Sequence, residues 1–508
     1  MAPILLIFIF VTISLALHLN RRERIRRIRL PPSPPTIPLL GNLLWLTKPF
    51  SQLEPTLHHL RAKYGPIFTL YVGALPVIFI MDGDHIHRSL VENGEVFADR
   101  PRPVLGSDLN TNLHSINNTP YGSLWRLLRR NLASEVIHPC KATTKSSSHV
   151  HRMTLDILLN RLKNEAKANG GVVIPIHSIR NSLSFLMISL CFGIVNLDEQ
   201  MVKQIQNVQW QLLFLVDKHF ALNLMPKVAL LLFLGRLRKL KQLRRAQKEL
   251  LIPLIRARKQ LAIHKRDQRH VISYVDSLLE LRVPNGVGNV RELSEEDIVS
   301  FCSEFLDASI WSTCAGLEWI MASLVKHQDV QKNLKKEIKG VVGDEKREVH
   351  MDELQRMPYL KAVIFEALRR HPPAHFLIPH RVKQDVLVDE YLIPKDAVIN
   401  CLVTGMGLDG RVWEDPLKFK PERFMAGGEG EGVDVQCGKS EIKMMPFGTG
   451  RRMCPGLDMA MIQLQYFVAN LVNEMEFKEV EGMEVDLSEK AELFVPMKNP
   501  FHAQISFA

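Results

Sequence analysis

The cysteine with the most distinctive surroundings is Cys454, in the segment PFGTGRRMCPG at positions 446–456. Gly448, Gly450 and Gly456 surround it, and glycine permits backbone conformations and close approaches that a side chain would block. The apolar pattern of the following LDMAMIQLQYFVANLV predicts a helix, so Cys454 is expected at a helix N-terminus, where partial positive charge favours a thiolate. Such a thiolate is suited to bind a metal. The plainer alternative is a structural or reactive cysteine in a glycine-rich loop.

The cysteine segment resembles the haem loop of cytochromes P450, Phe-x-x-Gly-x-Arg-x-Cys-x-Gly, at every fixed position. The resemblance implies a haem b cofactor (iron protoporphyrin IX) with Cys454 as its axial thiolate ligand, which pushes electron density toward oxygen and favours O–O cleavage. It also implies cofactor-binding roles for Phe447, Gly448, Arg452 and Gly456.

Two further motifs strengthen the resemblance. Glu366-Ala-Leu-Arg369 matches the family's Glu-x-x-Arg, with both side chains on one face of a helix that is expected to begin near Pro358. The PERF segment at 421–424 supplies the family's second arginine, Arg423. By resemblance, Glu366, Arg369 and Arg423 form a buried charge network that supports the haem loop. An isolated Glu-x-x-Arg would indicate only a helical ion pair.

A tryptophan and an arginine precede these motifs on an earlier expected helix. Trp125 and Arg129 are four residues apart, so an indole N–H and a guanidinium share one face, an arrangement that suits a carboxylate. By resemblance they bind the haem propionates, with Arg452 and His380 as the other contacts. Without the resemblance, the arginines would be read as a solvated face and His380 as an ordinary polar residue.

The longest expected helix starts at a capping box, Ser294-Glu295-Glu296-Asp297, and continues to about Val325. About 30 residues span about 45 Å, enough to cross a domain, and the helix is apolar on nearly all sides, which indicates burial. By resemblance, the stretch ASIWST at 308–313 lies over the haem, with Ala308 against the cofactor. The family usually carries Ala/Gly-Gly-x-Asp/Glu-Thr-Thr/Ser there.

This chain departs from that central pattern. Ser309 replaces the glycine that leaves room for oxygen, Trp311 replaces the acid that helps to move protons, and Ser312 conservatively replaces the catalytic alcohol. An indole N–H donates a hydrogen bond but cannot relay a proton as a carboxylate does. Asp307, four residues before Trp311, is a candidate relay; the alternative is a structural polar residue, and Glu304 lies another turn back.

The N-terminus is read as a membrane address. Residues 3–19, PILLIFIFVTISLALHL, are at the lower edge of a membrane span, and a run of six arginines follows between 21 and 29. A cleaved signal peptide would have its basic region first and a small-residue cleavage site afterwards. The sequence therefore predicts a single-pass anchor at 1–20 in the endoplasmic reticulum, a basic, proline-rich hinge or plain linker at 21–42, and one cytosolic catalytic domain at 43–508.

Composition agrees with this organisation. The net charge is +11, and its concentration after the apolar N-terminus favours membrane lipid over nucleic acid as the partner. The seven cysteines include no CxxC pair, which argues against a disulfide framework or a zinc site. Strand signals lie at 67–72, 76–81, 385–393 and 397–403, with a final pair expected in the last 25 residues, and helical periodicity fills most of the chain before residue 371. The expected fold is mainly α with small β-sheets, the cytochrome P450 fold. Residues 283–289 and 426–441 are expected to be surface loops.

The resemblance covers essentially the whole chain and is nearest to plant microsomal family 89, on the stretches at 293–308 and 379–400. It implies a monomeric monooxygenase that inserts one oxygen atom from O2 into an apolar plant metabolite, with electrons from NADPH through NADPH-cytochrome P450 reductase. The pocket walls would come from 110–121, 210–224, 308–313, 374–377 and 494–495. Two alternatives stay open: a reductase-independent enzyme that rearranges peroxides, and, because of Ser309 and Trp311, a haem-binding membrane protein that has lost oxygen activation.

Overall fold

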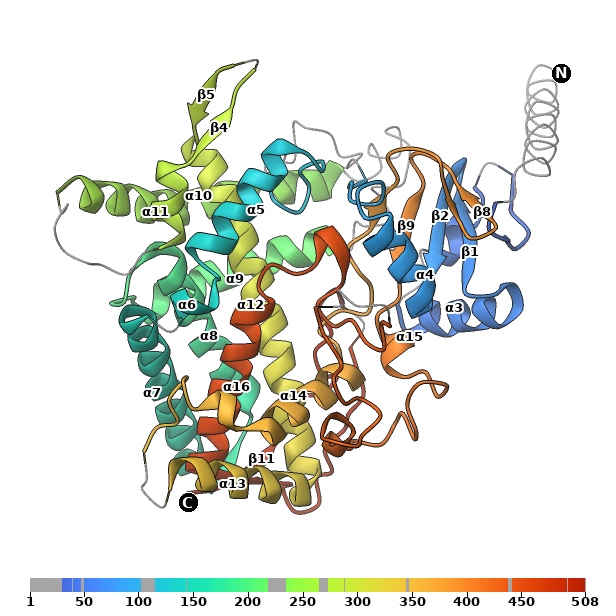
Figure 1. Ribbon diagram of the computed structural model, residues 1–508. Helices are drawn as coiled ribbons and strands as arrows, with labels where there is room; N and C mark the ends of the chain where they lie inside the picture. The colour runs from blue at the N-terminus through green and yellow to red at the C-terminus, as the bar shows by residue number, and fades with distance from the viewer. Residues whose placement is uncertain are drawn as a thin grey trace.

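The computed structural model describes residues 30–507, except for 39, 47–49, 102–114, 143, 218–233, 265–272, 287, 344–346, 437–440 and 491. The predicted anchor at 1–20 and the first part of the hinge lie outside the described residues, as do parts of two predicted pocket walls. The described chain is mainly helical, with its largest sheet on one side of the helices and smaller strand pairs elsewhere (Figure 1). This confirms the expected mixture of helix and strand.

The helices have the following bounds: α2 Leu43–Leu46, α3 Phe50–Tyr64, α4 Gly83–Ile86, α5 Ser123–Glu135, α6 Pro139–Ala142, α7 Lys145–Ala168, α8 Pro175–Phe192, α9 Glu199–Asp217, α10 Leu234–His264, α11 Tyr274–Glu280, α12 Glu295–Lys326, α13 Gln328–Val342, α14 Pro358–Arg370, α15 Thr404–Gly407 and α16 Leu457–Glu474. Four short turns of other helical types are η1 His87–Glu92, η5 Leu354–Arg356, η6 Pro421–Phe424 and η7 Gly450–Arg452.

Helix α12 is the axis of the helical part (Figure 1). Its predicted capping box is present: the Ser294 hydroxyl accepts from the Asp297 amide at 3.1 Å, and the Asp297 carboxylate accepts from the Ser294 amide at 3.0 Å. α12 packs against α8, α14 and α16. Gly316 lies at the contact with α16, where a Cβ would be in ordinary van der Waals contact with the Leu464 side chain at 3.4 Å.

Among the described helices, α12 alone is long and apolar enough to span a membrane, and 83% of that apolar stretch is buried inside the protein. The largest hydrophobic cluster surrounds it and includes Leu317, Trp319, Leu368 and Phe467, all almost completely buried. Burial of this much apolar surface makes α12 the core of the catalytic fold.

The largest sheet joins segments that are far apart in the sequence. β1 Ile67–Val72 pairs antiparallel with β2 Leu75–Ile80, β2 runs parallel to β9 Val398–Cys401, and β6 His380–Arg381 lies antiparallel beside β9. The strand order is β1-β2-β9-β6. This sheet brings His380 and the residues before it next to the segment that follows η1.

Two strand predictions and one loop prediction need correction. Residues 385–393 form two strands, β7 Val386–Val388 and β8 Tyr391–Ile393, because Asp389 adopts a left-handed conformation (φ 52°) that an aspartate tolerates in a turn. The last 25 residues contain one strand, β11 Ala503–Phe507, whose partners are β10 Met475–Lys478 and β3 Val172–Val173. The predicted loop at 283–289 is bracketed by a hairpin of β4 Arg282–Pro284 and β5 Val290–Glu292.

Candidate functional site

The cysteine loop is closed by its own backbone. The Cys454 amide donates to the Phe447 carbonyl at 2.9 Å, and the 3-10 turn η7 lies between these two residues. The Gly456 amide hydrogen-bonds the Cys454 sulfur, and α16 begins at the next residue, Leu457. The prediction that Cys454 stands just before a helix N-terminus is therefore confirmed.

Two of the loop glycines are required by geometry. Gly450 has φ 71°, and a Cβ on it would lie 2.0 Å from the Leu90 carbonyl oxygen in η1. Gly448 has φ 72°, and its Cβ would approach Leu377 to 3.3 Å. Only glycine adopts this conformation without strain and leaves the necessary space. The glycines therefore allow the cysteine loop to pack directly against η1.

Burial raises the pKa of the Cys454 thiol, and the Gly456 amide together with the charge of Arg129 offsets this effect only in part. Burial of the thiol thus opposes the stabilisation of a thiolate that the helix end favours. A bound metal cation overrides this balance, because coordination deprotonates a thiol outright. The site thus fits a thiolate that forms together with its metal.

The two predicted residues on α5 meet the cysteine loop. Trp125 is buried, and its indole nitrogen has no hydrogen-bond partner within the described chain. The Arg452 guanidinium lies 4.6 Å from the centre of the Trp125 ring. Arg129 donates to the Met453 carbonyl at 2.6 Å, one residue before the cysteine. The structure therefore brings Trp125, Arg129, Arg452 and Cys454 together.

Arg452 is held by backbone carbonyls. It donates to Ala98 at 2.8 Å, to Ile116 at 3.0 Å and to Thr119 at 2.6 Å. Burial lowers the pKa of Arg452 to about 10, so the group still carries its charge at neutral pH. The guanidinium is fixed in position by groups that satisfy its N–H donors but do not neutralise its charge.

His380 is also buried at this site, but it is a neutral side chain and not a charged one like the arginines. Its Nδ1 lies 2.7 Å from the Phe97 carbonyl oxygen, so Nδ1 carries the proton and Nε2 is an acceptor in the neutral ring. Burial, and then the charge of Arg100, lower the pKa of His380 to about 3, so the neutral ring dominates. In that form Nε2 offers a propionate no N–H.

Arg100 is a site residue that the sequence did not single out. It is buried and donates to the Ile378 carbonyl at 2.6 Å and the Pro379 carbonyl at 2.9 Å. Burial, and then the charge of Arg452, lower its pKa to about 9. In the sequence, Arg100 is one arginine in a proline-containing loop, and only the fold shows that it lies beside His380 and Arg452.

The three guanidiniums of Arg100, Arg129 and Arg452 provide a test of the implied cofactor. Arg100 is buried and the other two are half-buried, and in the described part of the chain none of them has a carboxylate at ion-pair distance. Asp99 and Glu304 act on Arg100 and Arg452 only from longer range, and burial of a charge without a close partner is costly. Two propionates would supply the missing negative charge, and the free Trp125 N–H would supply a donor. The residues present therefore fit haem.

The middle of α12 presents small residues to one side. Ala308 is the one exposed residue between Asp297 and Val325. The hydroxyls of Ser309 and Ser312 donate to the carbonyls four residues earlier, Phe305 at 2.7 Å and Ala308 at 2.6 Å. Ser312 lies on the Ala308 side of the helix, where it was predicted to act.

The two acids of α12 have different surroundings. Asp307 lies 3.4 Å from Ser303 in a polar group that includes Gln247 of α10, with Arg244 as the nearest cation, and burial raises its pKa to about 8. No hydrogen bond joins Asp307 to Ser312 among the described residues. This setting resembles that of a structural polar residue, the alternative to a relay.

Glu304 instead faces the arginine group. Its carboxylate accepts from the amides of Ile116 at 2.7 Å and Asn117 at 2.6 Å, in the same segment whose carbonyls hold Arg452. Burial raises the pKa of Glu304 to about 7 despite these hydrogen bonds and the nearby charge of Arg100. Of the two acids, Glu304 is therefore the one connected to the predicted cofactor contacts.

The predicted charge network is formed and completely buried. Arg369 binds both oxygens of Glu366, at 2.7 and 2.8 Å, and Arg423 approaches the same carboxylate at 3.4 Å. The Lys420 amide also donates to Glu366, at 2.9 Å. Each charge thus has a partner, so the network clamps α14 to η6.

Comparison with known proteins agrees with this geometry. The family model described as "Cytochrome P450" matches residues 31–505. The chain is 41% identical to "Cytochrome P450 89A9" of Arabidopsis thaliana, over 94% of the chain and 93% of that protein. It is 28% identical to "Isoflavone 3'-hydroxylase" of Medicago truncatula, over 97% of the chain and 95% of that protein, and 28% identical to "Flavonoid 3'-monooxygenase" of Arabidopsis thaliana, over 94% and 92%. The chain therefore belongs to the cytochrome P450 family of haem-thiolate oxidoreductases, and it is similar to plant monooxygenases.

Proposed function

We propose that this chain inserts one oxygen atom from O2 into a mainly apolar small molecule, with Cys454 as the haem ligand and NADPH as the source of electrons. The observation that carries the proposal is that the guanidiniums of Arg100, Arg129 and Arg452, one buried and two half-buried, gather around the Cys454 loop with no described carboxylate at ion-pair distance. When bound, the haem supplies the oxygen-activating chemistry and its thiolate favours O–O cleavage. Trp125, Arg129, Arg452 and Arg100 would hold its propionates, and the Phe447 to Gly456 loop would position the sulfur.

The residues of α12 would handle the substrate side and the protons. Ser312 is placed to exchange its hydrogen bond to Ala308 for one to a reacting group, because a hydroxyl both donates and accepts. Glu304 is the better proton reservoir, because its pKa of about 7 lets it hold and release a proton near neutral pH. Asp307, the relay suggested by helical spacing, is retained as the weaker candidate.

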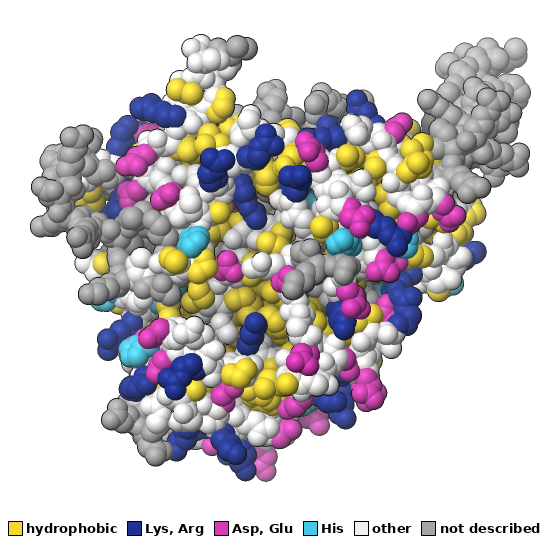
Figure 2. Space-filling model, in the orientation of Figure 1, with side chains coloured by type: hydrophobic (Ala, Val, Ile, Leu, Met, Phe, Trp, Pro, Cys, Tyr) yellow, Lys and Arg dark blue, Asp and Glu magenta, His cyan; other side chains and the backbone are white. Residues whose placement is uncertain are grey.

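The electron donor would be a membrane-bound NADPH-cytochrome P450 reductase. Figure 2 shows a group of basic side chains over α5, and Arg126, Arg130 and Arg451 are exposed in this region. Arg129 and Met453 join α5 to the cysteine loop, so this basic face covers the shortest route to the sulfur. An acidic partner surface would be steered toward it.

Residues 1–20 would anchor the enzyme in the endoplasmic reticulum membrane, residues 21–42 would form the hinge, and the catalytic domain would face the cytosol. The charge pattern of the N-terminal sequence supports this proposal, since six arginines directly follow the apolar segment. A monomer suffices for the proposed activity, because one chain supplies the cysteine, the propionate contacts and α12.

The deciding experiment reconstitutes the full-length enzyme with a plant reductase and measures NADPH use, product and peroxide on a panel of apolar plant metabolites. Product with little peroxide is the expected result. NADPH use that ends only in peroxide, or no turnover with any donor, contradicts the proposal. Rearrangement of an organic peroxide without NADPH would instead favour the second candidate, which the buried Trp311 in place of the usual acid keeps open.

A further inference from the structure

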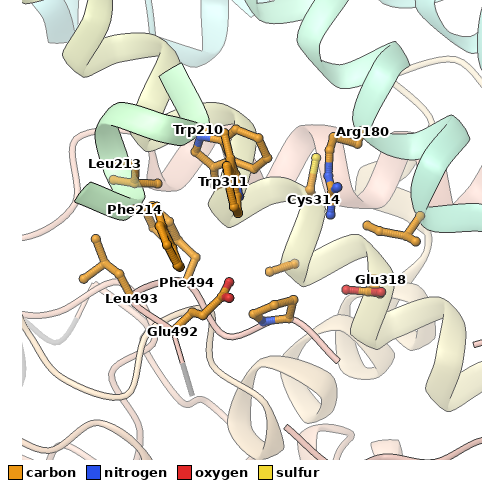
Figure 3. A pocket seen from close by; sticks show the side chains of 13 residues that line it. Arg180, Trp210, Leu213, Phe214, Trp311, Cys314, Glu318, Glu492, Leu493 and Phe494 are labelled. Atoms are coloured by element: carbon orange, nitrogen blue, oxygen red, sulfur yellow. The ribbon is translucent and has the colours of Figure 1, made fainter. Parts of the chain in front are cut away.

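A pocket lies between α8, α9, α12 and the segment 492–496 (Figure 3). Its wall is largely aromatic and aliphatic. Trp210 and Phe214 of α9 stack with their ring centres 5.0 Å apart and their planes 13° from parallel, and Trp311 of α12 and Phe494 add further rings. Such a wall would bind a flat, apolar body.

Arg180, which also lines the pocket, is charged and so differs from this apolar wall. Arg180 is the only residue of α8 with a full charge, and its guanidinium carbon lies 5.6 Å from the centre of the Trp311 ring. Its Nε is buried and has no hydrogen-bond partner, and no carboxylate lies at ion-pair distance from it within the described chain. Arginine does not give up its proton in proteins, so the pocket holds a permanent positive charge.

Neither of the two acids that line the same pocket lies at ion-pair distance from Arg180 in the described chain, although Glu318 is near enough for the charge of Arg180 to lower its pKa. Burial raises the pKa of Glu318 to about 7, so at neutral pH this carboxyl is protonated part of the time. Its Oε2 faces the Met497 amide at 3.4 Å. Glu492 pairs with Lys490 at 2.7 Å. Arg180 therefore has unused binding capacity for an anion.

The pocket has a polar end and an apolar end. Figure 3 shows Arg180 and Glu318 at one end and Phe214 with Leu493 at the other. Trp311 lies between them, beside Ser312 on α12. The Trp311 indole lies against the guanidinium of Arg180 and, unlike the carboxylate that the family usually carries at this position, has no negative charge with which to form an ion pair. The unusual tryptophan thus has a consequence for ligand choice.

We propose that this pocket selects organic carboxylates with an aromatic or otherwise apolar body, with the carboxylate bound by Arg180 and the body against Trp210 and Phe214. The guanidinium fork suits two parallel hydrogen bonds to a carboxylate. This inference rests on the proposed function, because it makes amphipathic acids the substrate class of the same enzyme. An uncharged apolar compound would leave Arg180 unpaired and would bind less well.

The test is equilibrium binding to the full-length holoenzyme, measured by calorimetry and by tryptophan fluorescence. The probes are 2-naphthylacetate, its methyl ester and its amide, which share one body and differ in charge. We expect the acid to bind at least about tenfold more tightly than the ester, since charge-assisted hydrogen bonds exceed neutral ones. Arg180→Gln should bring this ratio close to one and leave ester binding unchanged.

Further variants separate recognition from folding. Arg180→Lys keeps the charge but loses the fork, so part of the preference should remain. Trp311→Asp should weaken acid binding as well, because the new carboxylate competes for Arg180. Arg245→Gln on exposed α10 removes the same charge elsewhere and should change nothing. Equal binding of acid and ester by the native enzyme, or a preference that survives in Arg180→Gln with a native haem spectrum, overturns the inference.

These binding data do not depend on turnover. An acid preference in an enzyme that oxidises nothing would leave the carboxylate site standing and reject the monooxygenase proposal. Oxidation of neutral compounds without any acid preference would do the reverse.

Discussion

The residues around Cys454 (the cysteine side) and the residues that line the pocket with Arg180 and Trp311 (the pocket side) differ in how their polar and charged groups find partners. On the cysteine side, the arginines donate to backbone carbonyls, and the supporting Glu366, Arg369 and Arg423 pair with one another. On the pocket side, Arg180 and Trp311 each have a buried polar atom with no hydrogen-bond partner in the described chain. The chain thus satisfies the arginine donors of the cysteine side and leaves the Trp125 N–H and the balancing negative charge to the cofactor, whereas the polar groups of the pocket side depend on the ligand that enters.

This difference indicates that the cysteine side determines the chemistry and the pocket side determines what is recognised. Backbone carbonyls are present whatever the side chains are, so the cysteine side tolerates sequence change outside its motifs and keeps one chemistry. The pocket side is built from side chains on α8, α9 and α12, so single substitutions such as tryptophan at 311 change what it recognises. Variants on the two sides should accordingly fail in different ways.

The largest effect is expected from Cys454→Ser on the cysteine side. Serine cannot supply a thiolate, so the carbon monoxide complex of the reduced protein should lose its thiolate absorbance and NADPH-driven product should disappear completely. The fold should persist, because the loop is closed by the Cys454 amide and not by the sulfur. Circular dichroism checks the fold, and thiolate absorbance in the variant would contradict the ligand assignment.

The second largest effect is expected from Arg369→Ala, which tests whether the charge network stabilises the whole domain. Arg369→Ala leaves the buried carboxylate of Glu366 with the longer contact to Arg423 as its only ion pair and the Lys420 amide as a neutral donor, and removal of one partner of such a pair costs about 3–5 kcal/mol. Urea unfolding of the apoprotein should show this loss. Arg245→Ala removes an exposed i,i+4 ion pair and should stay within about 0.5 kcal/mol. Equal losses in the two variants would contradict a supporting role.

The same two regions show what the sequence could predict. The capping box of α12, the cysteine loop before α16 and the Glu366 network depend on residues within a few turns or on a motif of fixed spacing, and these predictions are confirmed. Arg100 could not be predicted, because its partners at 378 and 379 come next to it only when β6 joins the sheet. A single sequence carries no signal for such long-range pairing.

The strand errors have the same origin. Strand β11 was expected to pair within the last 25 residues, but its partners start at 172 and 475, and a strand pattern does not specify its neighbour. The choice between Asp307 and Glu304 was also out of reach. Helical spacing gives the face of α12, but not that the amides of Ile116 and Asn117 would approach Glu304.

Glu304 extends from α12 to the arginines of the cysteine side, and its titration gives a smaller effect. Its pKa is raised from 4.5 to about 7, so the native state keeps a proton that the unfolded chain releases. The stability from this group is fully present below about pH 4.5 and is lost as the pH rises through about 7, by about 1–2 kcal/mol after allowance for its partial exposure. Glu304→Gln should flatten this part of the stability profile relative to the native chain.

The measurement is urea unfolding at pH 4.5, 6 and 7.5. Glutamine keeps one acceptor for the Ile116 or Asn117 amide but opposes the other, and this hydrogen-bond cost to the variant does not depend on pH. Because the native chain loses stability as the pH rises through about 7 and the variant does not, the difference in stability between them should shrink as the pH rises. A constant difference across the range would mean that Glu304 is ionised throughout, which removes its role as a proton reservoir.

The smallest effect concerns the exterior of the cysteine side. Arg126→Gln and Arg130→Gln remove exposed charges from α5 without touching Arg129, which binds the loop. Rim charges act mainly on association rate, so reduction by the reductase should slow about two- to fivefold at low ionic strength. The deficit should fade near 0.5 M salt, where the Debye length is only about 4–5 Å. Arg245→Gln, an equal loss of charge on α10, should leave the rate unchanged.

An equal decrease in the reduction rate of this control would show that net charge, and not the α5 face, guides the electron donor. A deficit that persists at high salt would place these arginines in the structure of the site and erase the distinction between its interior and its docking face.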